Sequence, residues 1–233
     1  MPDQRHPTTE SLTSTAELTT PPTKLVWPKP RKKFSVIVAD PPWDKYQKGE
    51  RGAGRHYDLM NLESIMNMPV EDLAEENAQL WLWSTNSSLH DAYHVMEKWG
   101  FTDRMLYHWD KPVMGLGIYG RNASEPVILG TRGKAPVKFR SQPNWFFGPR
   151  QDHSHKPEEF FAIVERLYDG PYLELFARRH PSSNKDWSVW GNEIESDIFI
   201  PGYPVPKYSD KAVIPIEKPI SDKEIIPEEV CDE

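Results

Sequence analysis

The fold is decided by the stretch Val36-Ile37-Val38-Ala39-Asp40-Pro41-Pro42-Trp43. Its first half is a short apolar run rich in β-branched residues, which is typical of a strand buried on both faces of a sheet. The two prolines end this strand, because proline cannot donate a hydrogen bond to a β-ladder. We therefore expect Asp40 and Trp43 at the carboxyl end of a buried strand, in a loop that the prolines stiffen.

This position predicts a functional role for the loop, because open α/β sheets bind their ligands at the carboxyl ends of the strands. The alternative is an ordinary type I turn that happens to contain aspartate and tryptophan. The stretch alone leaves both interpretations open, and the choice depends on what other elements bring to the same edge.

The segments that follow alternate between strands and helices. A short helix is expected after Asn61, whose side chain can cap it. A second helix is expected over residues 87–99, and a third from Lys156, where a proline and two glutamates suit the first turn. Such alternation implies an α/β fold, with a mostly parallel sheet and helices on both faces. Further strands are expected at residues 79–84, 104–109, 126–131, 172–176 and 187–190.

Composition divides the 233 residues into three parts. Residues 1–23 are dominated by Thr, Ser, Pro and Glu, and residues 203–233 by Pro, Lys, Glu and Asp. Neither end can bury enough apolar area to offset the entropy of ordering, so we expect both to be disordered tails. Residues 24–202 are expected to form one folded domain, for which the nine Trp, nine Tyr and nine Phe of the chain supply an ample core.

The net charge of −7 is unevenly distributed. Residues 209–233 hold eight acids and three lysines, whereas residues 126–150 hold five basic residues, several aromatic ones and no acid. A second basic stretch, with three glycines, spans residues 45–55. Basic loops with aromatic side chains suit a phosphate backbone and an unstacked base, and the alternative is an ordinary solvated loop.

Cys231 is the single cysteine, which excludes an internal disulfide framework and indicates a reducing compartment. The N-terminus has no apolar signal-peptide core, and no apolar run approaches the length of a membrane span. We therefore expect no membrane association and a cytoplasmic location, or a nuclear one if the source has a nucleus. His153 and His155 are not accompanied by a third ligand pattern, so we expect no metal site.

Asp-Pro-Pro-Trp after a buried strand resembles the catalytic motif of the adenine-N6 methyltransferase family. This family includes the catalytic subunit of eukaryotic mRNA N6-adenosine methyltransferase and many phage and bacterial DNA adenine methyltransferases. The resemblance implies a Rossmann-like, S-adenosylmethionine-dependent methyltransferase fold, circularly permuted so that the catalytic loop precedes the cofactor-binding half. Further motifs match in the family's order: Tyr57-x-x-Met60, Leu80-Trp-Leu-Trp83, Trp109-x-Lys111, Glu125 ahead of Leu129-Gly130, His153-Ser-His-Lys-Pro157, Leu173-Glu-Leu-Phe-Ala-Arg178 and Trp187-x-x-Trp-Gly-Asn192.

The exocyclic amine of adenine is a poor nucleophile, because its lone pair is delocalised into the ring. In the family's pattern, Asp40 and the Pro41 carbonyl accept hydrogen bonds from this amine, and Trp43 stacks on the base. Tyr57 and Lys111 are expected to clamp the target nucleotide. The resemblance thus implies a catalytic motif made of Asp40, Pro41, Pro42 and Trp43.

For the cofactor S-adenosylmethionine, the family's pattern assigns Lys156 to the methionine carboxylate, which agrees with its position at a helix start. Glu174 is assigned to the ribose hydroxyls, as an acid that follows a strand is in dinucleotide sites. Glu193 stands where relatives often have glutamine, and residues 180–187 match the family only loosely. The remaining cofactor contacts are assigned to Asp40, Phe176, Arg178, His180, Asn192 and Glu193.

The intact motif favours an active enzyme that methylates the N6 amine of adenine in DNA. DNA is expected because a compact chain without a Cys/His zinc finger resembles the phage and bacterial members more than the eukaryotic RNA enzymes. The alternatives are the same reaction on RNA adenosine, and a non-catalytic relative that binds nucleic acid or acts as a scaffold. The aromatic residues 145–147 need covering, so a homodimer or heterodimer is a further expectation.

Overall fold

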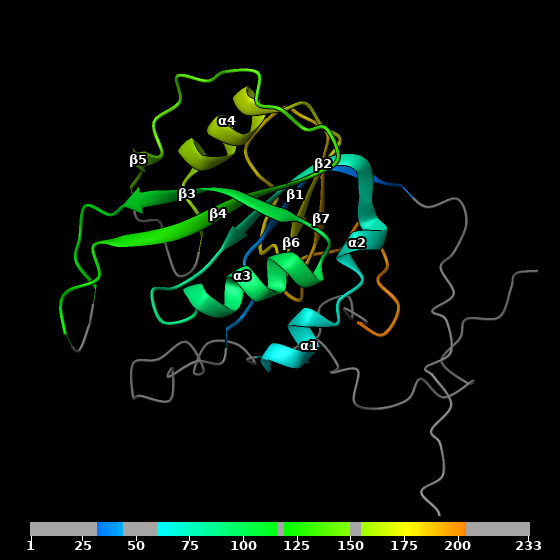
Figure 1. The fold of residues 1–233 in the computed structure, drawn as a ribbon, viewed down its shortest axis with the longest axis horizontal. Helices are drawn as coiled ribbons and strands as arrows, with labels where there is room; N and C mark the ends of the chain where they lie inside the picture. The colour runs from blue at the N-terminus through cyan, green and yellow to red at the C-terminus, as the bar shows by residue number, and fades with distance from the viewer. Residues whose placement is uncertain (1–31, 44–59, 116–118, 150–154, 204–233) are drawn as a thin grey trace, which may run out of the picture.

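The computed structural model describes residues 32–43, 60–115, 119–149 and 155–203. The strands of this part are β1 (Phe34–Ala39), β2 (Ala74–Trp83), β3 (Thr102–Asp110), β4 (Ser124–Arg132), β5 (Trp145–Phe147), β6 (Tyr172–Leu175) and β7 (Trp187–Trp190). They form one seven-stranded sheet in the order β5-β3-β4-β2-β1-β6-β7 (Figure 1). The strand that carries Asp40 at its end, β1, therefore lies inside the sheet, between β2 and β6.

The strand directions determine which residues share an edge. β4 pairs antiparallel with both β2 and β3, while the other neighbouring pairs are parallel. Among the described strands, β4 alone thus runs against the rest, and its first residues lie at the carboxyl edge of the sheet. The expected mostly parallel sheet is confirmed, and the circular permutation stays a prediction.

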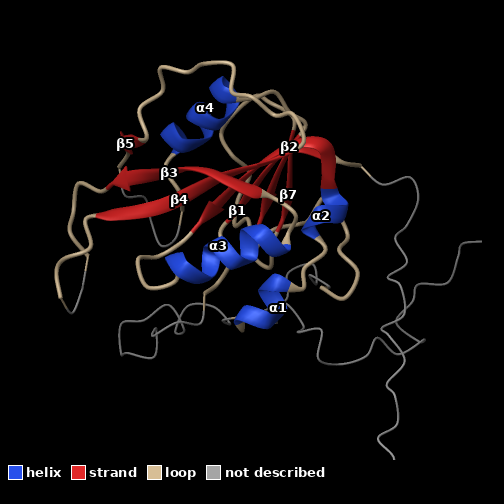
Figure 2. Cartoon of the chain, viewed as in Figure 1, coloured by secondary structure: helices blue, strands red, loops and turns tan. Residues whose placement is uncertain are grey.

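Four helices in the described part cover the sheet: α1 (Leu62–Met66), α2 (Val70–Leu73), α3 (Leu89–Lys98) and α4 (Glu158–Leu167). α1 and α3 lie on one face and α4 on the other, as predicted (Figure 2). Asn61 caps α1 as expected, since its Oδ1 accepts a hydrogen bond from the Ser64 N–H at 2.7 Å. Gly100 follows the C-cap of α3 with a φ of +81°, a conformation that glycine adopts readily.

Alternation along β1 divides the core into two layers. Ile37 and Ala39 pack with side chains of α1 and α3, whereas Val36 and Val38 pack with side chains of α4. All six residues of β1 are buried, which confirms the prediction of a strand covered on both faces. The loop after β1 therefore leaves a rigid, central strand.

Two elements differ from the sequence expectations. α2 is a single turn, and β5 lies within the stretch that the sequence indicates as a basic, aromatic loop. β5 has three residues and is defined by its pairing with β3, which local sequence does not encode. In addition, β2 begins at Ala74, ahead of the predicted residue 79, and α4 begins at Glu158, two residues after the predicted start at Lys156.

The predicted tails, residues 1–23 and 203–233, lie outside the described residues with one exception. Tyr203 is fully buried, and its hydroxyl donates a hydrogen bond to the Ser64 carbonyl at 2.7 Å. This contact ties the chain after β7 to α1, so the folded part reaches past the predicted boundary at residue 202. Residues 44–59, with Tyr57 and the second basic stretch, also lie outside the described part.

Candidate active site

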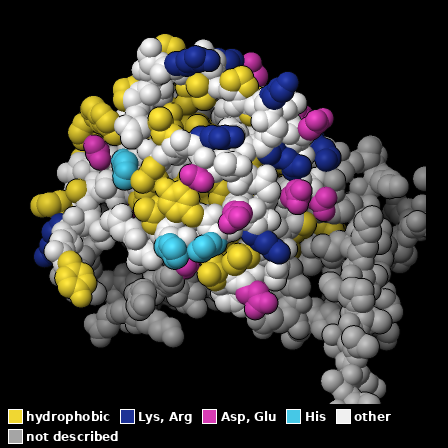
Figure 3. All heavy atoms as spheres, viewed as in Figure 1, with side chains coloured by type: hydrophobic (Ala, Val, Ile, Leu, Met, Phe, Trp, Pro, Cys, Tyr) yellow, Lys and Arg dark blue, Asp and Glu magenta, His cyan; other side chains and the backbone are white. Residues whose placement is uncertain are grey.

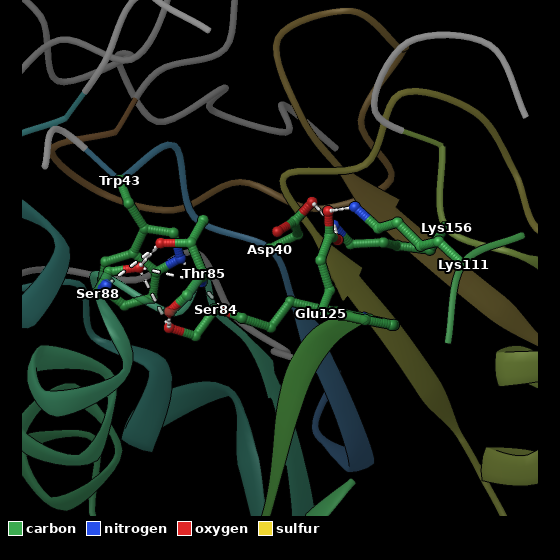
Figure 4. A network of polar contacts seen from close by, with 9 residues as sticks. Asp40, Trp43, Ser84, Thr85, Ser88, Lys111, Glu125 and Lys156 are labelled. Carbon is green, nitrogen blue, oxygen red and sulfur yellow. Dashed lines mark hydrogen bonds and ion pairs between the residues drawn. The ribbon is translucent and has the colours of Figure 1, made fainter. Parts of the chain in front are cut away.

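Four charged side chains from four parts of the chain meet at the carboxyl edge of the sheet (Figure 4). Asp40 directly follows β1, and Lys111 directly follows β3. Glu125 is the second residue of β4, which reaches this edge with its amino end because β4 runs against the other strands. Lys156 lies two residues before α4. We call these four residues the charged cluster.

Lys156 is the centre of the charged cluster. Its Nζ lies 2.8 Å from Asp40 Oδ2 and 3.2 Å from Glu125 Oε2. The other carboxylate oxygen of Glu125 accepts a hydrogen bond from Lys111 Nζ. Two ammonium groups thus alternate with two carboxylates, so their charges balance. The Lys156 ammonium also lies 4.7 Å from the centroid of the Trp83 ring, a favourable cation–π distance.

The ion pairs keep Glu125 and Lys156 charged. Burial by itself would raise the pKa of Glu125, but the positive charges of Lys156 and Lys111 outweigh it and lower this pKa to about 2. Burial would also lower the pKa of Lys156, but the carboxylates of Asp40 and Glu125 raise it. Both groups therefore stay charged at neutral pH.

Hydrogen bonds fix the loop after β1. The Trp43 N–H donates to the Pro41 carbonyl at 2.9 Å, and the Met60 N–H donates to the Pro42 carbonyl at 3.0 Å. The Trp43 Nε1–H donates to the Trp83 carbonyl at 3.1 Å. A carbonyl oxygen has two lone pairs, so the Pro41 carbonyl can accept a second hydrogen bond without losing the first.

The Trp43 indole is 5% exposed and belongs to the core layer on the side of α1 and α3. The structure places this side chain at the carboxyl edge, where its residue forms a bridge with Met60. Most of the ring surface already contacts protein atoms, which leaves little of it for a substrate base. The role of Trp43 in stacking on adenine stays a prediction.

A cluster of hydroxyl groups at the end of β2 was not expected from the sequence. The Thr85 N–H donates to Ser88 Oγ at 3.1 Å, and the Ser88 N–H donates to Thr85 Oγ1 at 3.2 Å. Ser84 Oγ lies 3.2 Å from Ser88 Oγ. These reciprocal bonds fix the turn into α3 beside Trp43 (Figure 4). The sequence signal is the polar run at residues 84–88, between a predicted strand and a predicted helix.

Glu174 lies on β6, where it pairs with Val38 of β1 and Val189 of β7. Burial, followed by the negative charge of Asp40, raises the pKa of Glu174 to about 8. The Glu174 carboxyl is therefore mostly protonated at pH 7. A neutral carboxyl can donate one hydrogen bond as well as accept others, which suits a contact with hydroxyl groups.

The raised pKa of Glu174 makes stability fall as pH rises. Between pH 4.5 and about 8, the folded state keeps a proton that the unfolded state has lost, so raising the pH lowers the free energy of unfolding. We expect Glu174→Gln to remove this part of the pH dependence and to be more stable than the wild type at pH 9. Urea unfolding without cofactor measures both, and parallel pH profiles would contradict the assignment.

The ends of β6 and β7 are in tight contact. The Ala177 N–H donates to the Trp190 carbonyl at 2.9 Å. Phe176 has a φ of +65° and is the one non-glycine residue of the described part with a left-handed backbone. A Cβ on Gly191 would lie 1.9 Å from the Ala177 carbonyl oxygen. A strained backbone at this edge supports a functional role for Phe176, in line with its predicted cofactor contact.

Gly191→Ala is expected to lower the free energy of unfolding by at least about 2 kcal/mol, because the new methyl group forces the ends of β6 and β7 apart. Gly120→Ala is the matched control, since nothing lies within 4 Å of a Cβ at that position. It should change stability by less than about 0.5 kcal/mol. Equal urea midpoints for the two variants would show that the contact at Gly191 relaxes without cost.

The predicted cofactor residues after β6 are only partly brought together. Arg178 Nε lies 3.5 Å from Glu193 Oε1, so these two form an ion pair. Asn192 is half-buried and directly follows Gly191, whereas His180 is exposed. The Arg179 guanidinium, which the sequence did not indicate, pairs with Glu158 at the start of α4.

A family model named MT-A70 matches residues 34–193, which include the whole charged cluster. The chain belongs to the MT-A70 family. It is 28% identical over 196 residues to the Mycoplasma protein "Type II methyltransferase M.MunI", covering 74% of this chain and 83% of that protein. It is also 32% identical over 188 residues to human METTL4, named an N(6)-adenine-specific methyltransferase, covering 70% and 38% of the two chains.

A further relative is human METTL3, the "N(6)-adenosine-methyltransferase catalytic subunit", with 26% identity over 174 residues and coverage of 70% and 28%. The chain therefore spans well under half the length of these human relatives. Membership in the MT-A70 family of adenine-N6 methyltransferases confirms the resemblance that the motifs indicate.

The sequence of this MT-A70 domain does not predict that Glu125 pairs with Lys156, although Glu125 belongs to one of the family's motifs. The sequence indicates a strand at residues 126–131 but not its direction, and the direction of this strand brings Glu125 to Lys156.

Within the described part, no group of three or more His, Cys, Asp or Glu side chains is placed to bind a metal. None of the helices described has both the length and the apolar character needed to cross a membrane.

Proposed function

We propose that this chain is an S-adenosylmethionine-dependent methyltransferase that modifies the N6 amine of adenine in DNA. The observation that carries the proposal is the Asp40 carboxylate, which Lys156 holds at the carboxyl edge of the sheet and which directly precedes Pro41 in the chain. Two hydrogen-bond acceptors on adjacent residues match the two N–H groups of one amine. Membership in the MT-A70 family supports adenine N6 as the acceptor.

The residues at this edge fit the proposed cofactor. The Lys156 ammonium has three donors, and its contacts with Asp40 and Glu125 use two of them, so one remains for the methionine carboxylate. The protonated Glu174 carboxyl suits the ribose hydroxyls. When bound, S-adenosylmethionine supplies a methyl group that its sulfonium already activates. The protein then contributes positioning more than acid–base catalysis.

The charged cluster orients Asp40 for the amine. Lys156 binds Oδ2, which leaves Oδ1 and the Pro41 carbonyl to accept the two N–H groups. Acceptors placed in this way draw the N–H groups out of the plane of the base and release the nitrogen lone pair for attack. Methylation would form the nitrogen–carbon bond as the methyl–sulfur bond breaks and a thioether leaves. The nitrogen would then have to lose one proton, and we assign the Asp40 carboxylate to receive it.

Support for DNA as the substrate comes from how much of each relative's length aligns with this chain. The alignment covers 83% of the Mycoplasma type II methyltransferase, whereas it covers 28% of the human N(6)-adenosine-methyltransferase subunit. Most of the human N(6)-adenosine-methyltransferase subunit thus lies outside the aligned region. Similarity to the same subunit favours RNA adenosine as the second candidate substrate.

Methyl transfer to matched adenine-containing DNA and RNA, single- and double-stranded, tests the proposal. Labelled S-adenosylmethionine and nucleoside mass spectrometry identify the product. N6-methyldeoxyadenosine is the expected product. N6-methyladenosine from RNA alone would replace the substrate and keep the chemistry, whereas no product on any substrate, with cofactor binding retained, would favour a non-catalytic relative or a required partner.

A further inference from the structure

The connection between β6 and β7 contains no helix. Residues 176–186 run from the end of β6 to the start of β7 without a helix or a strand. Parallel strands such as β6 and β7 are usually joined by a crossover helix, whose backbone hydrogen bonds make the connection rigid. Here side-chain contacts must fix the connection instead. It carries Arg178 and His180, two of the predicted cofactor residues, so its conformation bears directly on the proposed cofactor site.

Glu158, the first residue of α4, holds the middle of this connection. Its Oε2 accepts a hydrogen bond from the Ser182 N–H at 3.2 Å, and its Oε1 accepts one from the Ser182 hydroxyl at 3.1 Å. The Arg179 guanidinium pairs with the same carboxylate and donates to Ser182 Oγ at 3.4 Å. One carboxylate thus binds residues on either side of His180. We call Glu158, Arg179 and Ser182 the loop clamp.

The two ends of the connection are fixed as well. The Ala177 N–H donates to the Trp190 carbonyl at 2.9 Å, which holds the first end to β7. Trp187 Nε1 donates to Glu165 Oε1 at 2.8 Å, so a second glutamate of α4 holds the other end. Figure 1 shows the connection passing beside α4, in agreement with these contacts. The loop clamp fixes the part between the two ends.

The loop clamp lies close to the candidate active site. Burial and the charge of Asp40 raise the pKa of Glu174, and the positive charge of Arg179 counteracts them, so this guanidinium is near enough to act on the Glu174 carboxyl. Acidic and basic side chains are interspersed on the face seen in Figure 3, also in its upper part, where α4 lies. No broad field of one sign covers this face, so we expect the cofactor edge to depend on short-range contacts such as those of Glu158.

We propose that Glu158 is a positioning residue for the cofactor: it holds the β6–β7 connection against α4, so that Arg178 and His180 stay within reach of S-adenosylmethionine. This inference rests on the proposed function and adds to it a residue outside the family's motifs. A ligand that binds only the molecules with an ordered connection loses affinity in proportion to the fraction that is disordered. Two hydrogen bonds and an ion pair to one carboxylate favour the ordered state more than an isolated surface pair would.

Glu158→Ala tests the inference, and Glu159→Ala is its matched control. Each variant removes one of the two acids in the first turn of α4, so both affect the helix start to a similar extent, but Glu159 is exposed and has no part in the loop clamp. We expect Glu158→Ala to bind S-adenosylmethionine at least about fivefold more weakly in calorimetry. Its KM for S-adenosylmethionine should rise similarly while kcat stays within about twofold, and the Ser182 amide should exchange its hydrogen faster. Glu159→Ala should show none of these changes.

Arg179→Ala completes a double-mutant cycle. If both residues act through the loop clamp, the Glu158→Ala/Arg179→Ala variant should bind the cofactor about as weakly as Glu158→Ala alone, whereas additive losses would overturn the inference. Equal cofactor affinity in Glu158→Ala and Glu159→Ala would also overturn it, even with a lower urea midpoint, because a merely structural role changes stability alone.

Calorimetry needs no methyl transfer, so it separates this inference from the proposed function. A wild type whose cofactor affinity depends on Glu158, but which methylates no substrate, would sustain the inference and contradict the proposed function. A wild type that binds no S-adenosylmethionine would overturn both.

Discussion

Asp40→Ala is expected to reduce methyl transfer by at least about 1,000-fold, because it removes a hydrogen-bond acceptor that orients the amine and the base that receives its proton. The side chain lies at the end of β1 and is 30% exposed, so it contributes little to packing. The thermal midpoint should therefore change by only a few degrees. Radiolabel transfer at saturating oligonucleotide and S-adenosylmethionine measures the effect as a loss of kcat.

Asp40→Asn is the conservative control for this prediction. It retains one acceptor oxygen and the shape of the side chain, but it loses the negative charge that binds Lys156. We expect it to be nearly as inactive as the alanine variant, since the amide can neither receive the proton nor hold the ammonium as strongly. Activity of either variant within about tenfold of the wild type would exclude Asp40 from the chemistry.

Lys156→Met is the second change with a large expected effect. It leaves two carboxylates, those of Asp40 and Glu125, without the ammonium that both of them bind. We expect the pKa of Glu125 to rise, the KM for S-adenosylmethionine to increase at least about 100-fold, and kcat to fall as Asp40 loses its orientation. The cost in stability should stay below about 3 kcal/mol, because both carboxyl groups are about one quarter exposed and can turn toward water.

Adding Glu125→Gln to the Lys156→Met variant separates two effects of losing Lys156: the lost ion pairs, which affect stability, and the lost contact with the cofactor, which affects KM. In this background Glu125 keeps its ion pair with Lys111. The second substitution weakens that pair but relieves the repulsion between the Asp40 and Glu125 carboxylates, so it should cost less stability than in the wild type while the KM for S-adenosylmethionine stays high. The two substitutions are therefore expected to be non-additive in urea unfolding. Strictly additive effects on stability would show that Lys156 and Glu125 do not interact as the 3.2 Å distance indicates.

The sequence predicts those parts of the site that depend on local pattern. Asp40 could be placed at the carboxyl end of a buried strand because an apolar run ends in two prolines. Lys156 could be placed at a helix start because proline and glutamates follow it, and Asn61 could be identified as a cap by its side chain. Each of these signals lies within a few residues along the chain, where propensity and capping operate.

The remaining parts of the site depend on contacts between distant segments. Glu125 joins the charged cluster because β4 runs against its neighbours, and no local pattern fixes that direction. β5 is a strand because it pairs with β3, a distant segment, and the sequence of β5 alone predicts a loop. The raised pKa of Glu174 requires the burial that the assembled sheet provides, and the close approach of Gly191 to Ala177 requires β6 and β7 to be side by side.

Adenine N6 can be tested as the acceptor with a DNA strand that contains a single adenine, incubated with the wild-type protein and labelled S-adenosylmethionine. We expect all of the label to be recovered as N6-methyldeoxyadenosine after digestion and mass spectrometry. The same strand with purine in place of adenine, which lacks the exocyclic amine, should accept none. Label at adenine N1, on another base, or on the purine-containing strand would contradict the assignment of Asp40 and Pro41 to the N6 amine.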